Sequence, residues 1–227
     1  MAERPVFFFQ PGGVVQESLV GFKWFPGMAL SQARRSIASL HRAAEREVGR
    51  SPILEISSKS DIEEGVLLSA FNLRLTLGTE RSMTVEAVYQ ASKVFGHDDG
   101  PYEDLLFKSS LEAKRDPRVR RNDLVVEFRL FGESWPTEPK TAFYNWLYLK
   151  ALSENPELAD SLLKYQAFTD IAFNPKKSFN CQARAAALYV SLVQCGRFEE
   201  VLGNRSAFLE IFQGNVSTGQ TFNLLAD

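Results

Sequence analysis

Residues 84–95 limit the possible folds of this chain more than any other segment, because most of their side chains are apolar or small. When the segment is projected as a helix with about 100° per residue, Glu86, Gln90 and Lys93 fall within a wedge of about 60°. The polar face of a surface helix is usually much wider than this. We therefore predict a helix from about residue 84 to residue 95 that is buried on most sides.

The polar stripe of this helix has two interpretations that the spacing alone does not separate. Burial of an unpaired charge is costly, so Glu86 and Lys93 could form an internal ion pair that Gln90 bridges. Alternatively, the stripe lines a cleft. There, a partly desolvated lysine has a lowered pKa and can act as a nucleophilic amine, and a nearby carboxylate can transfer protons.

The scarcity of histidine and cysteine restricts the chemistry open to this chain. His41 lies in a predicted amphipathic helix and His97 beside a glycine, so neither a zinc site nor a Ser-His-Asp triad is favoured. Cys181 and Cys195 stand at the ends of another predicted helix, about 21 Å apart at about 1.5 Å per residue, which is too far for a disulfide. We expect no metal and no cofactor, and catalysis by carboxylate, lysine, tyrosine, asparagine or backbone groups.

The start of the chain and its charge balance predict a soluble cytoplasmic protein. Residues 1–5 lack the basic and apolar pattern of a secretory signal, and the longest apolar runs are far shorter than the roughly 20 residues of a membrane span. Two thiols without a disulfide suit a reducing compartment. The net charge of -2 predicts no general attraction to nucleic acid, so DNA would need a local basic patch.

The 227 residues, 44% of them hydrophobic, are enough for one large core. We predict one compact α+β domain over residues 1–227, mostly helical with a small sheet. An N-terminal extension of strands and a helix (1–64) packs on a core (65–195), and short helices end the chain (196–227). Periodicity and turn residues predict strands at 5–10, 18–25, 53–57 and 125–131, strand and turn at 67–72, and a loop at 168–180. Further helices are predicted from a Ser31 cap to Gly49, in part of 103–115, at 141–153, from Asn155 with Pro156, at 181–195, and near 198 and 206.

Three motifs resemble those of one protein family. The run VEAVYQASK at 85–93 resembles the Val-Glu-His-x-x-Gln-x-x-Lys helix of NADAR (YbiA-like) proteins. LSAF at 68–71 resembles the family's Leu-Ser-Asn-Phe element. Asp170, Asn174 and the run SFN at 178–180 resemble its Asp-rich loop and Gly-x-Asn helix entry. The sequence departs from the family at Ala87, where histidine is usual, at Ala70, where asparagine is usual, and before Asn180, where a glycine is absent.

The whole chain is more similar to one branch, the NADAR antitoxins paired with DarT-type toxins, through residues 22–28, 53–59, 141–144 and 168–171. Those toxins attach ADP-ribose from NAD to guanine in DNA. The resemblance therefore implies an N-glycosidase that removes ADP-ribose from guanine and needs no metal or cofactor. It also implies two partners, ADP-ribosylated DNA and possibly a cognate ADP-ribosyltransferase toxin.

The resemblance also implies roles for individual side chains. Lys93 would be the nucleophile that forms a Schiff base, Glu86 the general acid and base, and Asp170 a group that orients a ribose hydroxyl or water. In a second mechanism, Glu86 activates water directly and Lys93 only positions phosphate. The ligand-binding residues implied are Ser69, Asn72, Gln90, Asn174, Lys176 and Asn180.

Two further segments have a functional and a structural interpretation. The start of the helix at residue 181 could hold the diphosphate of ADP-ribose on free N–H groups, or Ser178 or Asn180 could simply cap it. Residues 114–121 could contact DNA phosphates or form a solvated basic loop. The basic side chains of this run are Lys114, Arg115, Arg118, Arg120 and Arg121.

Two other functions stay open at this point. One is a NADAR-type N-glycosidase that acts on a small phosphorylated aminopyrimidine ribotide, for which the same residues would serve. The other is a protein without catalytic activity that binds the toxin or ADP-ribose. Replacement of Glu86 or Lys93 would leave such a binding protein functional.

Overall fold

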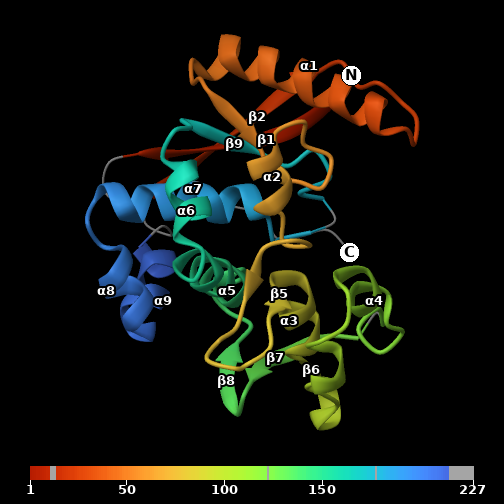
Figure 1. Cartoon of the computed structure of the whole chain (residues 1–227), viewed down its shortest axis with the longest axis vertical. Coiled ribbons are helices and arrows are strands. Elements are labelled where there is room, and N and C mark those ends of the chain that lie inside the picture. Colours follow the sequence, from red (N-terminus) through yellow and green to blue (C-terminus); the bar gives the residue numbers. More distant parts are fainter. Residues whose placement is uncertain (11–13, 122, 177, 215–227) are drawn as a thin grey trace.

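A four-stranded sheet lies between two helices in the upper half of the molecule (Figure 1). The structure is a computed structural model that describes residues 1–10, 14–121, 123–176 and 178–214. Strand β1 pairs antiparallel with β2 and β9, and β3 pairs parallel with β9. The strands are β1 (Ala2–Gln10), β2 (Val14–Phe22), β3 (Ile53–Glu55) and β9 (Ala167–Thr169). The segment 1–64 therefore shares a sheet with the predicted core.

The central position of β9 corrects the predicted loop at 168–180. Phe168 and Thr169 belong to a strand that is hydrogen-bonded on both sides, and the loop begins only after them. Three residues are too few to show a strand period, so pairing with two neighbours decides their conformation.

Both faces of β1 are covered, by α1 (Leu30–Val48) and by α7 (Gln182–Gln194), as Figure 1 shows. Val6 and Phe8 pack with Ile37 and Leu40 of α1, whereas Phe7 points the other way into the larger core. This alternation is the two-residue period of a strand. It makes the sheet the middle layer of this half of the fold.

Helix α1 ends at Gly49 as predicted but begins one residue earlier than its predicted cap. Gly49 takes the left-handed conformation with φ 68°, which a glycine adopts without strain. The residue before the helix is Ala29, and no side chain caps it. Ser31 lies inside the helix, so its prediction as the cap was wrong.

The helices of the last third confirm the α+β class. Helix α5 is buried on nearly all sides, which explains why its sequence shows no polar face. Pro156 occupies the first turn of α6 after Asn155, as the sequence predicts. The helices are α5 (Ala142–Ser153), α6 (Pro156–Leu162), α7, α8 (Phe198–Gly203) and α9 (Arg205–Gly214). No helix within the described residues is long and apolar enough to cross a membrane.

The helix predicted over 84–95 is shorter than expected. Helix α3 covers Val85–Ala91, and Lys93 begins a strand, β6 (Lys93–Phe95). The Ser92 hydroxyl donates to the Val88 carbonyl at 2.8 Å, and the Ser92 carbonyl accepts from the Arg129 amide at 2.7 Å. The second bond joins the chain to β7, so pairing with the neighbouring strand replaces further helical turns.

Strand β6 opens a second layer in the lower half of Figure 1. It pairs with β7, which pairs with β8, both antiparallel. Aromatic rings join this sheet to α5, with centroid distances of 4.7 Å for Phe128–Phe143 and 4.8 Å for Trp135–Trp146. The strand at 125–131 and the helical parts of 103–115 are confirmed. The elements are β7 (Val125–Leu130), β8 (Glu133–Pro136), a 3-10 turn at Gly96–Asp98, another at Glu103–Leu105, and α4 (Ser110–Arg115).

Residues 67–72 contain the predicted turn but not the predicted strand. Helix α2 (Glu63–Leu67) ends at Leu67, and turns follow in which the Ser69 carbonyl accepts from the amides of Asn72 and Leu73. A short hairpin, β4 (Arg74–Leu75) and β5 (Met83–Thr84), then leads into α3. Local hydrogen bonds close this segment on itself instead of leaving it free for a sheet.

A buried polar network joins β3, β9 and α1. Glu55 accepts from the Thr169 hydroxyl at 2.7 Å and from the Ile171 amide at 2.9 Å, and Thr169 also bonds the His41 ring at 2.9 Å. Burial lowers the pKa of His41 to about 4, against the opposing charges of Asp61 and Glu45. Burial raises the pKa of Glu55. His41 thus belongs to this internal network, although it is only partly buried.

The His41 pKa predicts how stability depends on pH. Because the folded-state pKa lies below the unfolded value, neutral His41 favours folding above about pH 6.5, and this contribution disappears as pH falls towards 4. A His41→Gln variant keeps an amide able to bond Thr169 but does not titrate. We expect the stability advantage of the natural protein over this variant to grow by about 1 kcal/mol between pH 4.5 and 6.5, after discounting for partial exposure. Urea unfolding at several pH values measures it, and parallel curves would contradict it.

Candidate active site around Glu86 and Lys93

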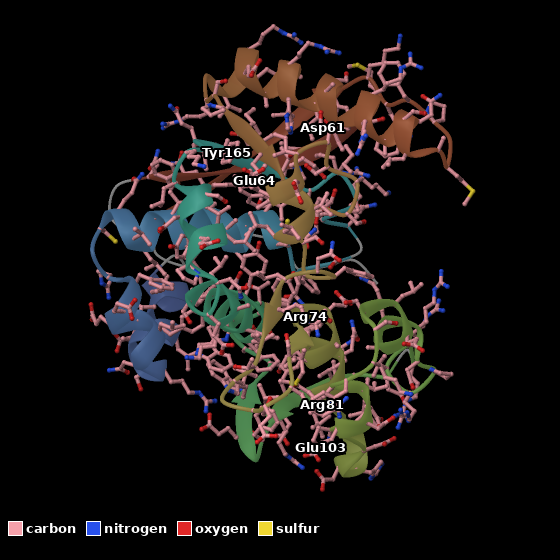
Figure 2. The ribbon with its side chains drawn as sticks, viewed as in Figure 1. Asp61, Glu64, Arg74, Arg81, Glu103 and Tyr165 are labelled. Atoms are coloured by element: carbon pink, nitrogen blue, oxygen red, sulfur yellow. The ribbon has the colours of Figure 1, made fainter. Side chains whose placement is uncertain are left out.

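The hairpin and the turns before it fix the start of α3. The Glu86 amide donates to the Ala70 carbonyl at 2.9 Å, and the Thr84 hydroxyl caps the helix by accepting from the Ala87 amide at 3.3 Å. Arg74 closes the hairpin loop by donating to the Ser82 hydroxyl at 2.8 Å and the Ser82 carbonyl at 2.7 Å. Figure 2 labels Arg74 at the upper end of this loop. The first turn of α3 is therefore held from two sides.

Glu86 is almost fully buried, and one of its two oxygens carries its polar contacts. Its Oε1 atom accepts from Gln90 Nε2 at 2.9 Å and lies 3.3 Å from Lys114 Nζ. No hydrogen bond to Oε2 occurs among the described residues. The first of the two interpretations, an internal ion pair with Lys93, is therefore wrong, because the counter-ion of Glu86 is Lys114 of α4, which runs beside α3 (Figure 1). Gln90 holds the carboxylate but bridges no pair.

Lys93 stands at the first position of β6, next to the end of α3. Its Nζ atom lies 5.3 Å from the ring centroid of Tyr89. Burial lowers the pKa of Lys93, the charge of Glu86 opposes this, and Lys114 adds to it. The amine is consequently neutral for a larger fraction of the time than that of an exposed lysine, which favours nucleophilic chemistry.

Two tyrosines that the sequence left without a role border the site. Asn180 donates from Nδ2 to the Tyr89 hydroxyl at 2.6 Å, which ties the loop before α7 to α3. The Tyr144 ring stands edge-on to Tyr89 at 5.4 Å. Burial raises the pKa of both tyrosines, so their hydroxyls stay protonated. Tyr89 is three positions after Glu86 on the same helix, and this spacing is the signal that could have identified it.

Asp170 organises the loop before α7, and its charge acts on Tyr144. Its Oδ1 atom accepts from the amides of Ala172 at 3.0 Å and Phe173 at 3.2 Å, and its Oδ2 atom accepts from Gln182 Nε2 at 3.1 Å. Burial and the nearby charge of Glu55 raise its pKa to about 7. Both oxygens of Asp170 thus accept hydrogen bonds from the protein itself.

Gln182 is a residue that sequence reasoning missed. Its Oε1 atom accepts from the Ala70 amide at 2.7 Å, and its Nε2 atom donates to the Ile56 carbonyl at 2.6 Å. It therefore links the Asp170 loop to the turn that holds Glu86. No local pattern marks this glutamine, because its partners lie 12 to more than 100 residues away.

The remaining predicted ligand residues lie in turns. Asn72 is exposed and donates to the Val66 carbonyl and to the Ser69 hydroxyl. Asn174 accepts from the amide of Lys176, whose side chain is exposed. The residue before α7 is Cys181, with no side-chain cap, so the predicted capping by Ser178 or Asn180 was wrong.

The basic run at 114–121 is largely neutralised by acids. Arg118 pairs with Asp104 at 2.7 Å and Asp116 at 2.9 Å, and Arg121 pairs with Asp99 at 2.6 Å. Arg115 and Arg120 are exposed, and no ion pair of theirs occurs among the described residues. Lys114 in turn pairs with Glu86. Few of the described basic side chains in this run are therefore left without an acidic partner and able to contact DNA phosphates.

Gly100 gives the sharpest test of how Lys93 is held. A Cβ atom at Gly100 would lie 2.2 Å from the Lys93 carbonyl oxygen, and φ is +117°. A Cβ at Gly96 would meet nothing within 4 Å. We expect Gly100→Ala to lower the free energy of unfolding by about 2 kcal/mol. The matched Gly96→Ala should change it by less than about 0.5 kcal/mol. Urea unfolding distinguishes them, and equal effects would contradict the packing described.

Comparison with known proteins gives one family. The family model described as DarT1-associated NADAR antitoxin matches residues 2–221. No curated protein matches the chain. The match confirms the resemblance seen in the motifs, and it includes the N-terminal strands as well as the region around Glu86. The chain belongs to the family of DarT1-associated NADAR antitoxins.

Proposed function

We propose that this protein is an ADP-ribosyl-guanine N-glycosidase, which removes ADP-ribose from guanine bases in DNA and so acts as the antitoxin of a DarT-type toxin. The observation that carries the proposal is a buried carboxylate, Glu86, whose charge acts on a partly buried amine, Lys93, with a lowered pKa. A carboxylate with one unbonded oxygen can transfer protons, and a neutral amine can attack carbon.

The reaction would begin at C1″ of the ribose, which is bonded to the exocyclic amine of guanine. Opening of the sugar ring converts this N-glycoside to an imine. The Lys93 amine adds to C1″, Glu86 takes the two protons of this amine one after the other and passes each to the guanine nitrogen, and the C–N bond to guanine breaks. A Schiff base between Lys93 and C1″ remains.

Water would complete the reaction. Glu86 takes a proton from water as the oxygen adds to C1″ and passes it to the Lys93 nitrogen. It then moves the remaining hydroxyl proton to the same nitrogen, a carbonyl forms at C1″, and the bond to Lys93 breaks. The net change is the addition of one water, which yields ADP-ribose and unmodified guanine. The carboxylate serves as base and then as acid in each half of the reaction, and its unbonded Oε2 atom suits this transfer.

Other residues would hold the substrate. Asn180, which already bonds Tyr89, can change partner to a ribose hydroxyl, and the exposed Lys176 can meet the diphosphate. Asn72 and Asn174 contribute amides near the same loops, while Ser69 and Asp170 keep these loops in shape. In this proposal, the whole chain works as one domain in the cytoplasm.

Replacement of the two central residues tests the proposal. We expect Lys93→Ala to slow release of ADP-ribose from a guanine-ADP-ribosylated oligonucleotide by about 1000-fold or more, and Glu86→Gln by about 100-fold or more. Chromatography of released ADP-ribose measures the rates. Lys164→Ala, which removes an exposed lysine after α6, is the control and should keep the natural rate.

The same variants, tested for protection of cells, and a second substrate in the release assay separate the alternatives. Folded Glu86 and Lys93 variants that still protect cells from the toxin would show a binding antitoxin and contradict the enzyme. A phosphorylated aminopyrimidine ribotide that is hydrolysed much faster than the modified oligonucleotide would assign the site to a small metabolite instead.

A further inference from the structure

Lys114 reaches the buried site from a helix that carries none of the motif residues. Its Nζ atom lies 3.3 Å from Glu86 Oε1 and 5.0 Å from the ring centroid of Phe71. The Lys114 side chain is 53% exposed, whereas that of Glu86 is 8% exposed. Lys114 therefore extends from solvent over an aromatic ring to the carboxylate.

The charge of one carboxylate, Glu86, thus acts on two lysines, and only one of them forms an ion pair with it. Glu86 is the counter-ion of Lys114, and no ion pair of Lys93 occurs among the described residues. The Oε1 atom of Glu86 is already shared between Gln90 and Lys114. The Lys93 Nζ atom lies 5.3 Å from the ring centroid of Tyr89. An aromatic face attracts a cation less strongly than a carboxylate does.

We propose that Lys114 is a positioning residue of this site, which occupies Glu86 and so prevents that carboxylate from forming an ion pair with Lys93. The consequence for catalysis rests on the proposed function. A Lys93 amine without a full counter-charge stays unprotonated more often and can attack C1″. Removal of Lys114 would free Glu86 to pair with Lys93 and hold it protonated.

The groups that face Lys93 support the proposal that Glu86 pairs with Lys114 and not with Lys93. From α3 they are Glu86 and the protonated hydroxyl of Tyr89, and from α4 Lys114. From α5, the hydroxyl of Tyr144 stays protonated as well. Phe128 is the register partner of Lys93 on β7. Its neighbours Glu127 and Arg129 project to the opposite face of the strand and pair with each other. Glu86 and Lys114 are thus the charges that act on Lys93.

Competitive labelling tests the proposal without any substrate. Trace acetic anhydride reacts with neutral amines, so the pH dependence of acetylation at Lys93, followed by peptide mass spectrometry, reports its pKa. We expect Lys114→Gln to raise this pKa by about 0.5 to 1 unit. Lys114→Arg, which keeps the charge, and Arg115→Gln, which removes a neighbouring unpaired charge, should stay near the natural value. An unchanged pKa in folded Lys114→Gln overturns the proposal.

The pH profile of glycosidase activity provides the second measurement. In Lys114→Gln, the acid limb should move to higher pH, with activity 3- to 10-fold lower at pH 7 and restored at alkaline pH. A loss of the same size at every pH would mean that Lys114 only binds an anionic substrate, which also overturns the proposal. If the natural protein releases no ADP-ribose, the proposed function fails, while the labelling result still decides the effect of Lys114 on Lys93.

Discussion

The change from helix to strand after Ala91 determines how the two charged groups of the site are arranged. Glu86 is carried by the first turn of α3, whose amide bonds the Ala70 carbonyl, and Lys93 is carried by β6, whose partner is β7. The two side chains therefore come from different secondary-structure elements. Each is held by its own hydrogen bonds, and the separation leaves room for Lys114 to take Glu86 as its counter-ion.

The site depends on a second network that lies deeper in the fold. Gln182 joins the Asp170 loop to the turn at Ala70, and that turn holds the start of α3. The same loop ends at Asn180, which bonds Tyr89 of α3. The loop is thus hydrogen-bonded both to the turn before α3 and to Tyr89 within it. The buried Glu55 network also anchors the loop to β3 through the Ile171 amide.

Most of the architecture could be predicted from the sequence where the signal is local. Apolar periodicity, the Asn155–Pro156 start and Gly49 located the long helices, because each depends on neighbours along the chain. The strand β9 and the end of α3 could not be predicted in this way. Both are decided by hydrogen bonds to strands distant in sequence, which propensity does not record.

The site was predicted in part for the same reason. The narrow polar stripe identified Glu86, Gln90 and Lys93 as residues of one buried surface, although a continuous helix was the wrong geometry for it. The partners that decide the charge and shape of the site are Lys114, Tyr89 and Gln182. Lys114 and Gln182 come from other elements and carry no motif, so only the folded arrangement shows them. In the sequence, Lys114 belongs to a basic run, whereas in the structure its side chain contacts Glu86.

The covalent role of Lys93 is tested most directly by trapping. Sodium cyanoborohydride reduces a Schiff base to a stable amine, so ADP-ribose caught on the protein can be located by peptide mass spectrometry. With guanine-ADP-ribosylated DNA as substrate, the mechanism predicts an adduct on the peptide that contains Lys93 and none in Lys93→Ala. Rapid release of ADP-ribose without any trapped adduct would contradict it and would leave direct attack by water as the reaction.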